Sequence, residues 1–279
     1  MIPRRIIQTG PTRALSPLAK AAATNLKLLH PDWEYRYFDD AEIRLFLRAE
    51  FPQHETIFDQ FPRNIQRIDF FRYLAVYRLG GFYFDLDVFL SRSLDDLCLK
   101  QAVFTFEELS LNRHLREQHE LDWEIGNYAF GAAPGDPFMA AAIENCVKAQ
   151  QDPAWLTPMM RGIPAPFAAE FRVLNSTGPG LLTRTLAENP SLNVTVLFPE
   201  DVRDPDSWHL FGDYGVHLME GSWRSKGSCL FRRAAAFWEN RARKRFERQS
   251  RALGPTRTFP PRPVPQLTPH VAPSPVPDR

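Results

Sequence analysis

The sequence predicts an α/β fold with a mixed central sheet. Short apolar segments typical of strands alternate with helical patterns up to Phe231. A hydrophobic content of 44% and a charged content of 24% are ordinary for a globular protein. A chain of 279 residues can form one large domain, or at most two small ones. We therefore expect residues 1–231 to form one α/β domain.

The expected elements follow one another in well-marked segments. Strands are expected over 5–9, 34–38, 80–88, 103–106, 128–132 and 193–198, and helices over 18–29, 41–50, 64–79, 137–149 and 180–188. Pro31 closes the first helix. Gly80 and Gly81 end the helix over 64–79, because glycine accepts the left-handed conformation of a helix C-terminus.

The composition changes after the α/β segment. Residues 232–251 are rich in arginine and lysine around alanine and aromatic side chains, which predicts a basic amphipathic helix. That helix can pack Phe237 and Trp238 on the domain, or attach to an anionic membrane surface. Residues 252–279 are dense in proline and poor in aliphatic side chains, so we expect a disordered tail.

The composition argues against several classes of function. A formal net charge of +1 gives no electrostatic reason to expect nucleic-acid binding. Cys98, Cys146 and Cys229 are scattered, which opposes a zinc site and a disulfide framework and suits a reducing compartment. No apolar run approaches the roughly 20 residues that span a bilayer, and no signal peptide is evident. We expect a cytoplasmic protein, with peripheral membrane contact through 232–251 as an addition.

The most informative segment is the expected strand over 80–88, which carries Asp85 and Asp87 among apolar and aromatic residues. Side chains of a strand alternate between its two faces. One face would carry Tyr83, Asp85 and Asp87, and the other Phe82, Phe84, Leu86 and Val88. Adjacent carboxylates repel each other and are costly to bury, and a divalent cation would relieve both effects. The alternative is a surface turn with two hydrated aspartates.

The helix before this strand carries Asp69 and Arg72, three residues apart and therefore on one helical face. They can form a structural ion pair. Alternatively, both point toward the strand terminus beside Asp85 and Asp87, where ligands of α/β folds tend to bind. An arginine beside metal-binding carboxylates suits a diphosphate, because its planar donors pair with phosphate oxygens.

The segments IDFFRY (68–73) and YRLGGFYFDLDV (77–88) resemble the DXD-sugar region of glycosyltransferase family 32. The resemblance is carried by Asp69, Arg72, Tyr73, Gly80, Gly81, Tyr83, Asp85 and Asp87. Weaker similarities lie in 2–9, 30–35 and 214–223, so the resemblance spans roughly residues 2–225. The usual serine of the motif is Ile68 here, and the second histidine and first tryptophan of the last segment are replaced by Leu218 and Met219.

The resemblance implies a GT-A fold and a retaining transferase that uses a nucleotide-sugar donor with Mn²⁺ or Mg²⁺. It implies that Asp85, Asp87 and His217 hold the metal, with Asp87 as the most direct ligand. It also implies that the donor is bound by Asp69, Arg72, Asp85, Gln8, Thr9, Ser222 and Trp223. Asp85, Asp87 and Arg72 would be the catalytic groups, because negative charge grows on the leaving diphosphate.

Other candidate residues have competing interpretations. His217 taken alone is more often structural than a ligand. Glu107, Glu108, Asp122 and Glu124 fall between two expected strands, where solvated surface is favoured over acceptor contact. Asn127 is interpreted as a turn residue rather than a sugar contact. The segment 178–180 lacks the lysine of a phosphate loop and is interpreted as a turn into a helix.

The sequence therefore favours a metal-dependent glycosyltransferase that moves a hexose to a glycan or glycolipid acceptor. One alternative is a hydrolase of sugar or phosphate esters that uses the same carboxylates. Another is a non-catalytic module that binds a nucleotide sugar. The base and sugar of the donor, the acceptor and the catalytic nucleophile or base do not follow from these residues.

Overall fold

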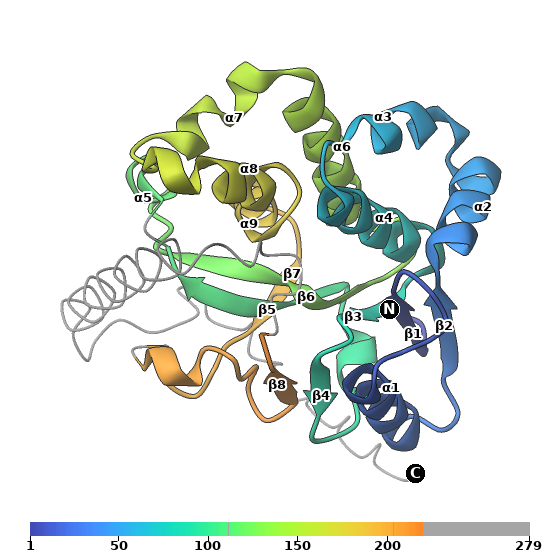
Figure 1. Ribbon diagram of the computed structural model, residues 1–279. Helices are drawn as coiled ribbons and strands as arrows, with labels where there is room; N and C mark the ends of the chain where they lie inside the picture. The colour runs from blue at the N-terminus through green and yellow to red at the C-terminus, as the bar shows by residue number, and fades with distance from the viewer. Residues whose placement is uncertain (111, 203, 220–279) are drawn as a thin grey trace, which may run out of the picture.

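A computed structural model describes residues 1–110, 112–202 and 204–219. Its centre is a six-stranded mixed sheet with strand order β2-β1-β3-β6-β5-β7, and β4 pairs with β8 in a separate small sheet (Figure 1). The strands are β1 (Arg5–Thr9), β2 (Glu34–Phe38), β3 (Gly81–Phe84), β4 (Val88–Leu90), β5 (Ala102–Leu109), β6 (Trp123–Ala132), β7 (Val194–Leu197) and β8 (Gly215–His217). This confirms the predicted α/β class with a mixed sheet.

Helices cover the two faces of the sheet unequally (Figure 1). The helices are α1 (Pro17–Leu29), α2 (Asp40–Glu50), α3 (Glu55–Gln60), α4 (Asn64–Leu79), α5 (Arg113–His119), α6 (Pro137–Gln151), α7 (Pro153–Met160), α8 (Ala168–Ser176) and α9 (Pro179–Glu188). Helices α4, α6, α8 and α9 lie on one side, while α1 and the β4–β8 pair lie on the other.

Each face of the sheet has its own apolar core. The larger core joins α4 and α6 to the sheet through side chains such as Phe71, Phe104 and Phe130. The smaller core lies under α1 and β4, where Phe82 and Phe84 are buried. Tyr83 lies between these two phenylalanines and belongs to the larger core. Strand β3 therefore shows the predicted alternation over its own length.

Parallel pairing determines where the strands end. Strand β1 pairs in parallel with both β2 and β3, so the carboxyl ends of these three strands meet at one edge. Gly80 ends α4 with a φ of 65°, as the sequence predicts. Gly81 has a φ of 111°, and a Cβ there would lie 2.7 Å from the carbonyl oxygen of Arg5. Two glycines thus let the chain turn sharply from α4 into the strand beside β1.

The strand predicted over 80–88 is interrupted, which corrects the sequence interpretation. Strand β3 ends at Phe84, and the next residues form a turn closed by the Val88 amide donating to the Asp85 carbonyl at 3.3 Å. Strand β4 then begins at Val88 and pairs with β8 instead of continuing the central sheet. The common face predicted for Tyr83, Asp85 and Asp87 therefore does not exist beyond Phe84.

The other predicted elements are present with small differences at their ends, and β6 begins earlier than the predicted strand, at Trp123. Short elements were missed, namely α3, α5, α7, α8, β4 and β8. No helix among the described residues is long and apolar enough to cross a membrane. The predicted helix over 232–251, the tail over 252–279 and the domain boundary at 231 lie outside the described residues and stay predictions.

Candidate active site

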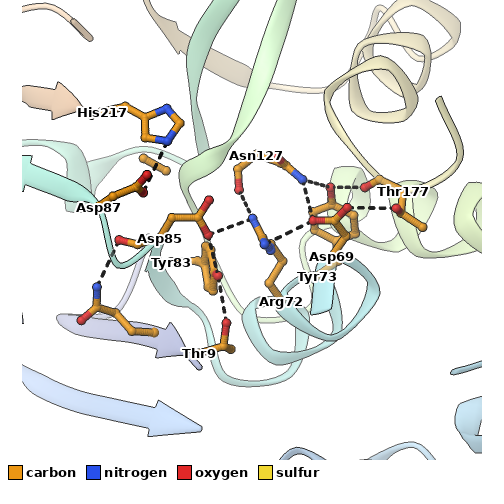
Figure 2. Close-up of polar contacts among 12 residues, drawn as sticks. Thr9, Asp69, Arg72, Tyr73, Tyr83, Asp85, Asp87, Asn127, Thr177 and His217 are labelled. Atoms are coloured by element: carbon orange, nitrogen blue, oxygen red, sulfur yellow. Dashed lines mark hydrogen bonds and ion pairs between the residues drawn. The ribbon is translucent and has the colours of Figure 1, made fainter. Parts of the chain in front are cut away.

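The candidate site lies where β1 and β3 end, and it extends to the start of β4 (Figure 2). Asp85 follows the last residue of β3, and Gln8 and Thr9 are the last residues of β1. The carboxyl edge of parallel strands is the usual place for ligands in open α/β sheets. The structure thus collects at one edge several of the residues predicted from three separate segments.

Pairing between β4 and β8 brings Asp87 and His217 together. Val88 is opposite His217 in this antiparallel pair, and the Leu218 amide donates to the Asp87 carbonyl at 3.0 Å. His217 Nε2 lies 3.4 Å from Asp87 Oδ1, and the imidazole stacks on Tyr128 with 4.1 Å between ring centroids. The histidine predicted from the distant segment 214–223 is therefore beside the predicted aspartate.

These side chains form a cluster that suits a divalent cation. Asp85, Asp87 and His217 each offer a ligand atom, and the three atoms lie within 4.8 Å of one another. Ligand atoms that share an octahedral ion at about 2.1 Å lie about 3 Å apart, close to the Asp87–His217 distance. Two carboxylates and one imidazole suit ions such as Mg²⁺ or Mn²⁺. The residues present therefore fit a divalent cation of this kind.

The pKa of His217 depends on its neighbours, because most of this side chain is buried. Its Nδ1 atom is buried and has no hydrogen-bond partner among the described residues. Burial alone would lower the pKa of His217, but the hydrogen bond and the charge of Asp87 outweigh burial, so its pKa is raised. The carboxylates at this edge thus favour positive charge at the position of His217, as they would favour a cation.

Arg72 is the buried centre that links the helix to the strand end. Its Nη2 lies 3.2 Å from Asp69 Oδ1, and its Nη1 lies 3.2 Å from Asp85 Oδ1 (Figure 2). Nη1 also donates to the Asn127 carbonyl at 2.8 Å, and the guanidinium lies over the Tyr83 ring at 4.5 Å. The predicted ion pair of Asp69 and Arg72 is present, and of the two residues Arg72 is the one that reaches Asp85.

The charge on Arg72 is supported by its neighbours. Burial disfavours the charged guanidinium, but the carboxylates of Asp85 and Asp69 outweigh that effect, so the pKa of Arg72 is raised. Arg72 Nε is buried and finds no hydrogen-bond partner within the described part of the chain. The charged side chain therefore holds Asp85 in place through Nη1.

Asp69 lies behind Arg72 and is fully surrounded by donors. Its Oδ2 accepts from Thr177 Oγ1 at 2.9 Å, and its Oδ1 accepts from Asn127 Nδ2 at 3.0 Å in addition to its ion pair. Burial raises its pKa to about 7, although Arg72 and the bond from Thr177 act in the opposite direction. Asp69 therefore anchors the arginine from inside the protein and is 3% exposed.

Asn127 and Thr177 both donate hydrogen bonds to Asp69, which the sequence pattern did not predict for either residue. Asn127 lies within β6, so its interpretation as a turn residue is wrong. Its amide also donates to the Tyr73 hydroxyl at 3.2 Å, and that hydroxyl donates to the Thr177 carbonyl at 2.5 Å. A polar side chain in an otherwise apolar strand was the available signal for Asn127. The segment 178–180 begins α9, as predicted, with Gly178 at the N-cap.

The end of β1 supports the Asp85 turn. Gln8 Nε2 donates to the Asp85 carbonyl at 3.3 Å, and Gln8 Oε1 accepts from the Tyr35 hydroxyl at 2.8 Å. The Thr9 hydroxyl and the Tyr83 hydroxyl are 3.0 Å apart, and Tyr83 donates to Asp85 Oδ1 at 2.8 Å. Gln8 and Thr9 are buried, so they support the Asp85 turn from the interior of the protein.

Glu107, Glu108, Asp122 and Glu124 were interpreted as solvated surface between strands, and the structure corrects this. Glu107 and Glu108 lie in β5 and Glu124 lies in β6, and all four are partly buried. Glu124 accepts from the Ser110 hydroxyl, and burial raises its pKa. The negative charge of Glu107 helps to raise the pKa values of Tyr128 and His217, which places it near the cluster.

Residues 18–104 match the sequence profile of the family described as "Glycosyltransferase sugar-binding region containing DXD motif". The chain is therefore similar to that family over about a third of its length. The matched range contains α4 with Asp69 and Arg72, and the turn with Asp85 and Asp87. It confirms the family resemblance that the segments 68–73 and 77–88 carry.

Several fungal proteins are similar to part of this chain. The chain is 33% identical over 144 residues to inositol phosphoceramide mannosyltransferase 3 of Schizosaccharomyces pombe, covering 52% of this chain and 37% of the relative. It is 38% identical over 148 residues to mannosyltransferase 2 of the same organism, covering 53% and 39%. With mannosyl phosphorylinositol ceramide synthase SUR1 of Saccharomyces cerevisiae it shares 28% identity over 183 residues, covering 66% and 41%. The chain thus spans well under half the length of these relatives.

Solved structures with some likeness are also glycosyltransferases. The PaToxG glycosyltransferase has a TM-score of 0.47 at 15% identity, with 67% of this chain and 70% of that chain covered. The galactosyltransferase LgtC in complex with donor and acceptor sugar analogs has a TM-score of 0.41 at 14% identity, with 89% and 95% covered. A likeness at these TM-scores says nothing about the residues of the site.

Two of the predicted donor-binding residues, Ser222 and Trp223, lie outside the described residues.

Proposed function

We propose that this protein is a metal-dependent, retaining glycosyltransferase of the GT-A type. It moves a hexose from a nucleotide-sugar donor to a glycan or glycolipid acceptor. The observation that carries the proposal is the cluster of Asp85, Asp87 and His217, which adjoins the buried Arg72 at the carboxyl edge of the sheet. Its chemistry suits a donor diphosphate with a divalent cation.

Asp87 and His217 are the side chains that would hold Mn²⁺ or Mg²⁺, with Asp85 as the third ligand. Bound there, the ion would supply Lewis-acid stabilisation of the negative charge that grows on the leaving diphosphate. Asp85 Oδ1 already accepts from Tyr83 and pairs with Arg72, so the orientation of this carboxylate is set before substrate arrives. Preorganised charges of this kind commonly contribute about 3 kcal/mol to a transition state.

Arg72 and Asp69 have positioning roles in this proposal. The Nη atoms of Arg72 contact Asp69, Asp85 and the Asn127 carbonyl, so Arg72 orients the Asp85 carboxylate at the site of the donor diphosphate. Asp69 is enclosed by Thr177 and Asn127, so it acts on the donor through Arg72. Gln8 and Thr9 act in the same way, through the Asp85 turn, and Ser222 and Trp223 would close over the diphosphate.

The names of the curated relatives support mannose as the first sugar to test. They also support an inositol phosphoceramide or a similar glycolipid as the first acceptor. A lipid acceptor lies at a membrane surface, so a cytoplasmic location with peripheral contact through the basic segment 232–251 belongs to this proposal.

Thermal unfolding of the chain with GDP, UDP and their sugars, with and without Mn²⁺, tests the proposal. We expect one nucleotide to raise the unfolding temperature only when metal is present, because the cluster needs the ion to accept a diphosphate. The same nucleotide sugar should then transfer its hexose to an acceptor, with the anomeric configuration retained.

Three results would contradict the proposal in different ways. If no nucleotide stabilises the protein with any metal, the protein has no donor site. Stabilisation without transfer to any glycan or glycolipid, and without hydrolysis, would indicate a binding module. Release of free sugar at a rate that acceptors do not change would indicate a hydrolase.

A further inference from the structure

A second group of metal-ligating side chains lies at the junction of α5 and α9. His114, His119 and Glu188 each offer one ligand atom, and the three atoms lie within 4.8 Å of one another. Helix α5 belongs to the segment between β5 and β6, and Glu188 is the last residue of α9. Figure 1 shows α5 at the opposite side of the molecule from β1, β2 and α1. None of these three residues belongs to the candidate active site.

We propose that His114, His119 and Glu188 bind a zinc ion that joins α5 to α9. Two imidazoles and one carboxylate form a ligand set typical of zinc, and a fourth position would be taken by water. The ion would be a second metal of the protein, chemically distinct from the one proposed for the two aspartates and His217. Those carboxylate-rich ligands favour harder ions such as Mg²⁺ and Mn²⁺.

The two histidines are already arranged closely. Their ring centroids are 5.2 Å apart, and the ring planes make an angle of 80°. Tetrahedral ligands at about 2.0–2.1 Å from zinc lie about 3.3 Å apart, so no pair of ligand atoms has to approach by more than about 1.5 Å. Rotation of the His119 side chain, at the end of α5, can supply this movement while Arg184 keeps its contact with Glu188.

His114 provides an independent reason to expect a ligand here. Its Nε2 atom is buried and has no hydrogen-bond partner among the described residues. A buried polar nitrogen without a partner is unfavourable by about 1–3 kcal/mol, and a metal ion would satisfy it. The Asn112 side chain accepts from the His114 amide at 3.0 Å, which fixes the start of the helix that presents this ring.

Glu188 forms an ion pair with Arg184. Arg184 Nε donates to Glu188 Oε1 at 2.6 Å, and Arg184 Nη1 donates to the Trp155 carbonyl at 2.6 Å. The guanidinium also lies over the Trp155 ring at 3.7 Å. Arg184 thereby orients the carboxylate, and Oε2 is the oxygen that we assign to the metal. Outer contacts of this kind commonly tune metal ligands.

The scattered cysteines oppose a zinc site, as the sequence indicated, only where cysteine is a ligand. This cluster contains no cysteine and joins residues far apart in the sequence. The ion would tie the segment between β5 and β6 to the helix that follows Thr177. Its role in the proposal is structural, because it links two elements and lies apart from Asp85 and Asp87.

Zinc binding is best measured on the full chain after the cluster of Asp85, Asp87 and His217 has been disabled by substitution. Equilibrium dialysis of Zn²⁺ against this disabled-site protein, Asp87→Asn/His217→Gln, should give one ion per chain. In that background, His114→Gln and His119→Gln should each weaken the affinity for zinc at least tenfold. His54→Gln is the matched control, because His54 packs on Phe51 and Phe70 at ring distances of 6.0 and 5.6 Å, away from this cluster.

A measurement without metal shows whether a loss of zinc binding comes from misfolding of the variant. Circular dichroism with a chelator present should show the same fold for each glutamine variant as for its parent. If His114→Gln does not fold, His119→Gln and Glu188→Gln carry the test, because His119 ends α5 and Glu188 is exposed. The inference is overturned if the disabled-site protein binds no zinc, or if the glutamine variants bind zinc as tightly as the His54→Gln control.

Discussion

His217 Nε2 lies 3.4 Å from Asp87 Oδ1, although the two residues belong to segments far apart in the sequence. The antiparallel pair of β4 and β8 causes this contact, since it sets Val88 opposite His217. The short turn after β3 directs the chain into β4 rather than along the central sheet. Two adjacent carboxylates thereby gain an imidazole neighbour, and the three side chains form the proposed metal site.

Replacement of Asp87 by asparagine tests that site. The change keeps the size of the side chain but removes one of the two carboxylates beside His217. We expect the metal-dependent stabilisation by nucleotide to be lost and the transfer rate to fall by about 10²–10³-fold. Thermal unfolding with nucleotide and Mn²⁺, together with a transfer assay, measures both effects.

Asp213→Asn is the matched control for Asp87→Asn. Asp213 pairs with Arg92 at 2.7 Å, and its side chain is 70% exposed, so little stability depends on it. It precedes β8, close in sequence to His217. Equal losses of nucleotide binding in the two variants would argue against a specific role for Asp87.

Replacement of Arg72 by methionine tests the buried link between α4 and the strand end. The side chain is 3% exposed, and its loss would leave Asp69 without its cation. We expect the free energy of unfolding to fall by about 3–5 kcal/mol, measured by urea denaturation. The double variant Asp69→Asn/Arg72→Met should recover part of this loss, because the buried charge is then removed as well. Equal stability of the single and double variants would show that the pair is not coupled.

The hydroxyl of Thr177 is predicted to stabilise Asp69. Thr177→Val removes the donor that lies 2.9 Å from Asp69 Oδ2, while Thr177→Ser keeps a hydroxyl in the same place. We expect the valine variant to lose about 1–3 kcal/mol of unfolding free energy, and the serine variant to lose much less. If both variants unfold at the same denaturant concentration, the hydrogen bond does not contribute to stability.

His30 is predicted to make stability depend on pH. Its Nδ1–H donates to the Leu26 carbonyl at 2.9 Å, and its Nε2 accepts from the Leu94 amide at 3.0 Å, so the neutral ring joins α1 to the segment after β4. Burial lowers the pKa of His30, although the Leu26 bond and Asp95 act in the opposite direction. The unfolded chain therefore binds a proton more readily than the folded chain, and protonation destabilises the fold.

The test of His30 compares the wild type with His30→Asn, which cannot titrate. The stability advantage of the wild type should be complete above its unfolded pKa of about 6.5 and should shrink as the pH falls below that value. Urea denaturation at pH 7.5 and pH 5.5 measures this difference, and other titrating groups cancel between the two proteins. A difference that stays constant, or that grows in acid, would contradict the assigned tautomer.

Local patterns were sufficient for much of the fold. Helix α4 has the predicted limits, since a helical pattern over 64–79 ends at a glycine pair whose backbone suits a helix C-terminus. Strands β1 and β2 also match their predicted limits. The short helices α5, α7 and α8 were missed, because tertiary packing stabilises such helices more than their own sequences do.

Residue types and spacing within single segments were sufficient to predict the α/β class, the resemblance to the DXD-containing family and the chemistry of the site residues. Which of these residues lie together depends on the tertiary structure. It ended β3 at Phe84, it placed His217 beside Asp87 through the β4–β8 pair, and it set Asn127 and Thr177 around Asp69. Such contacts join segments far apart in the chain, so they depend on strand pairing and helix packing, which no local pattern encodes.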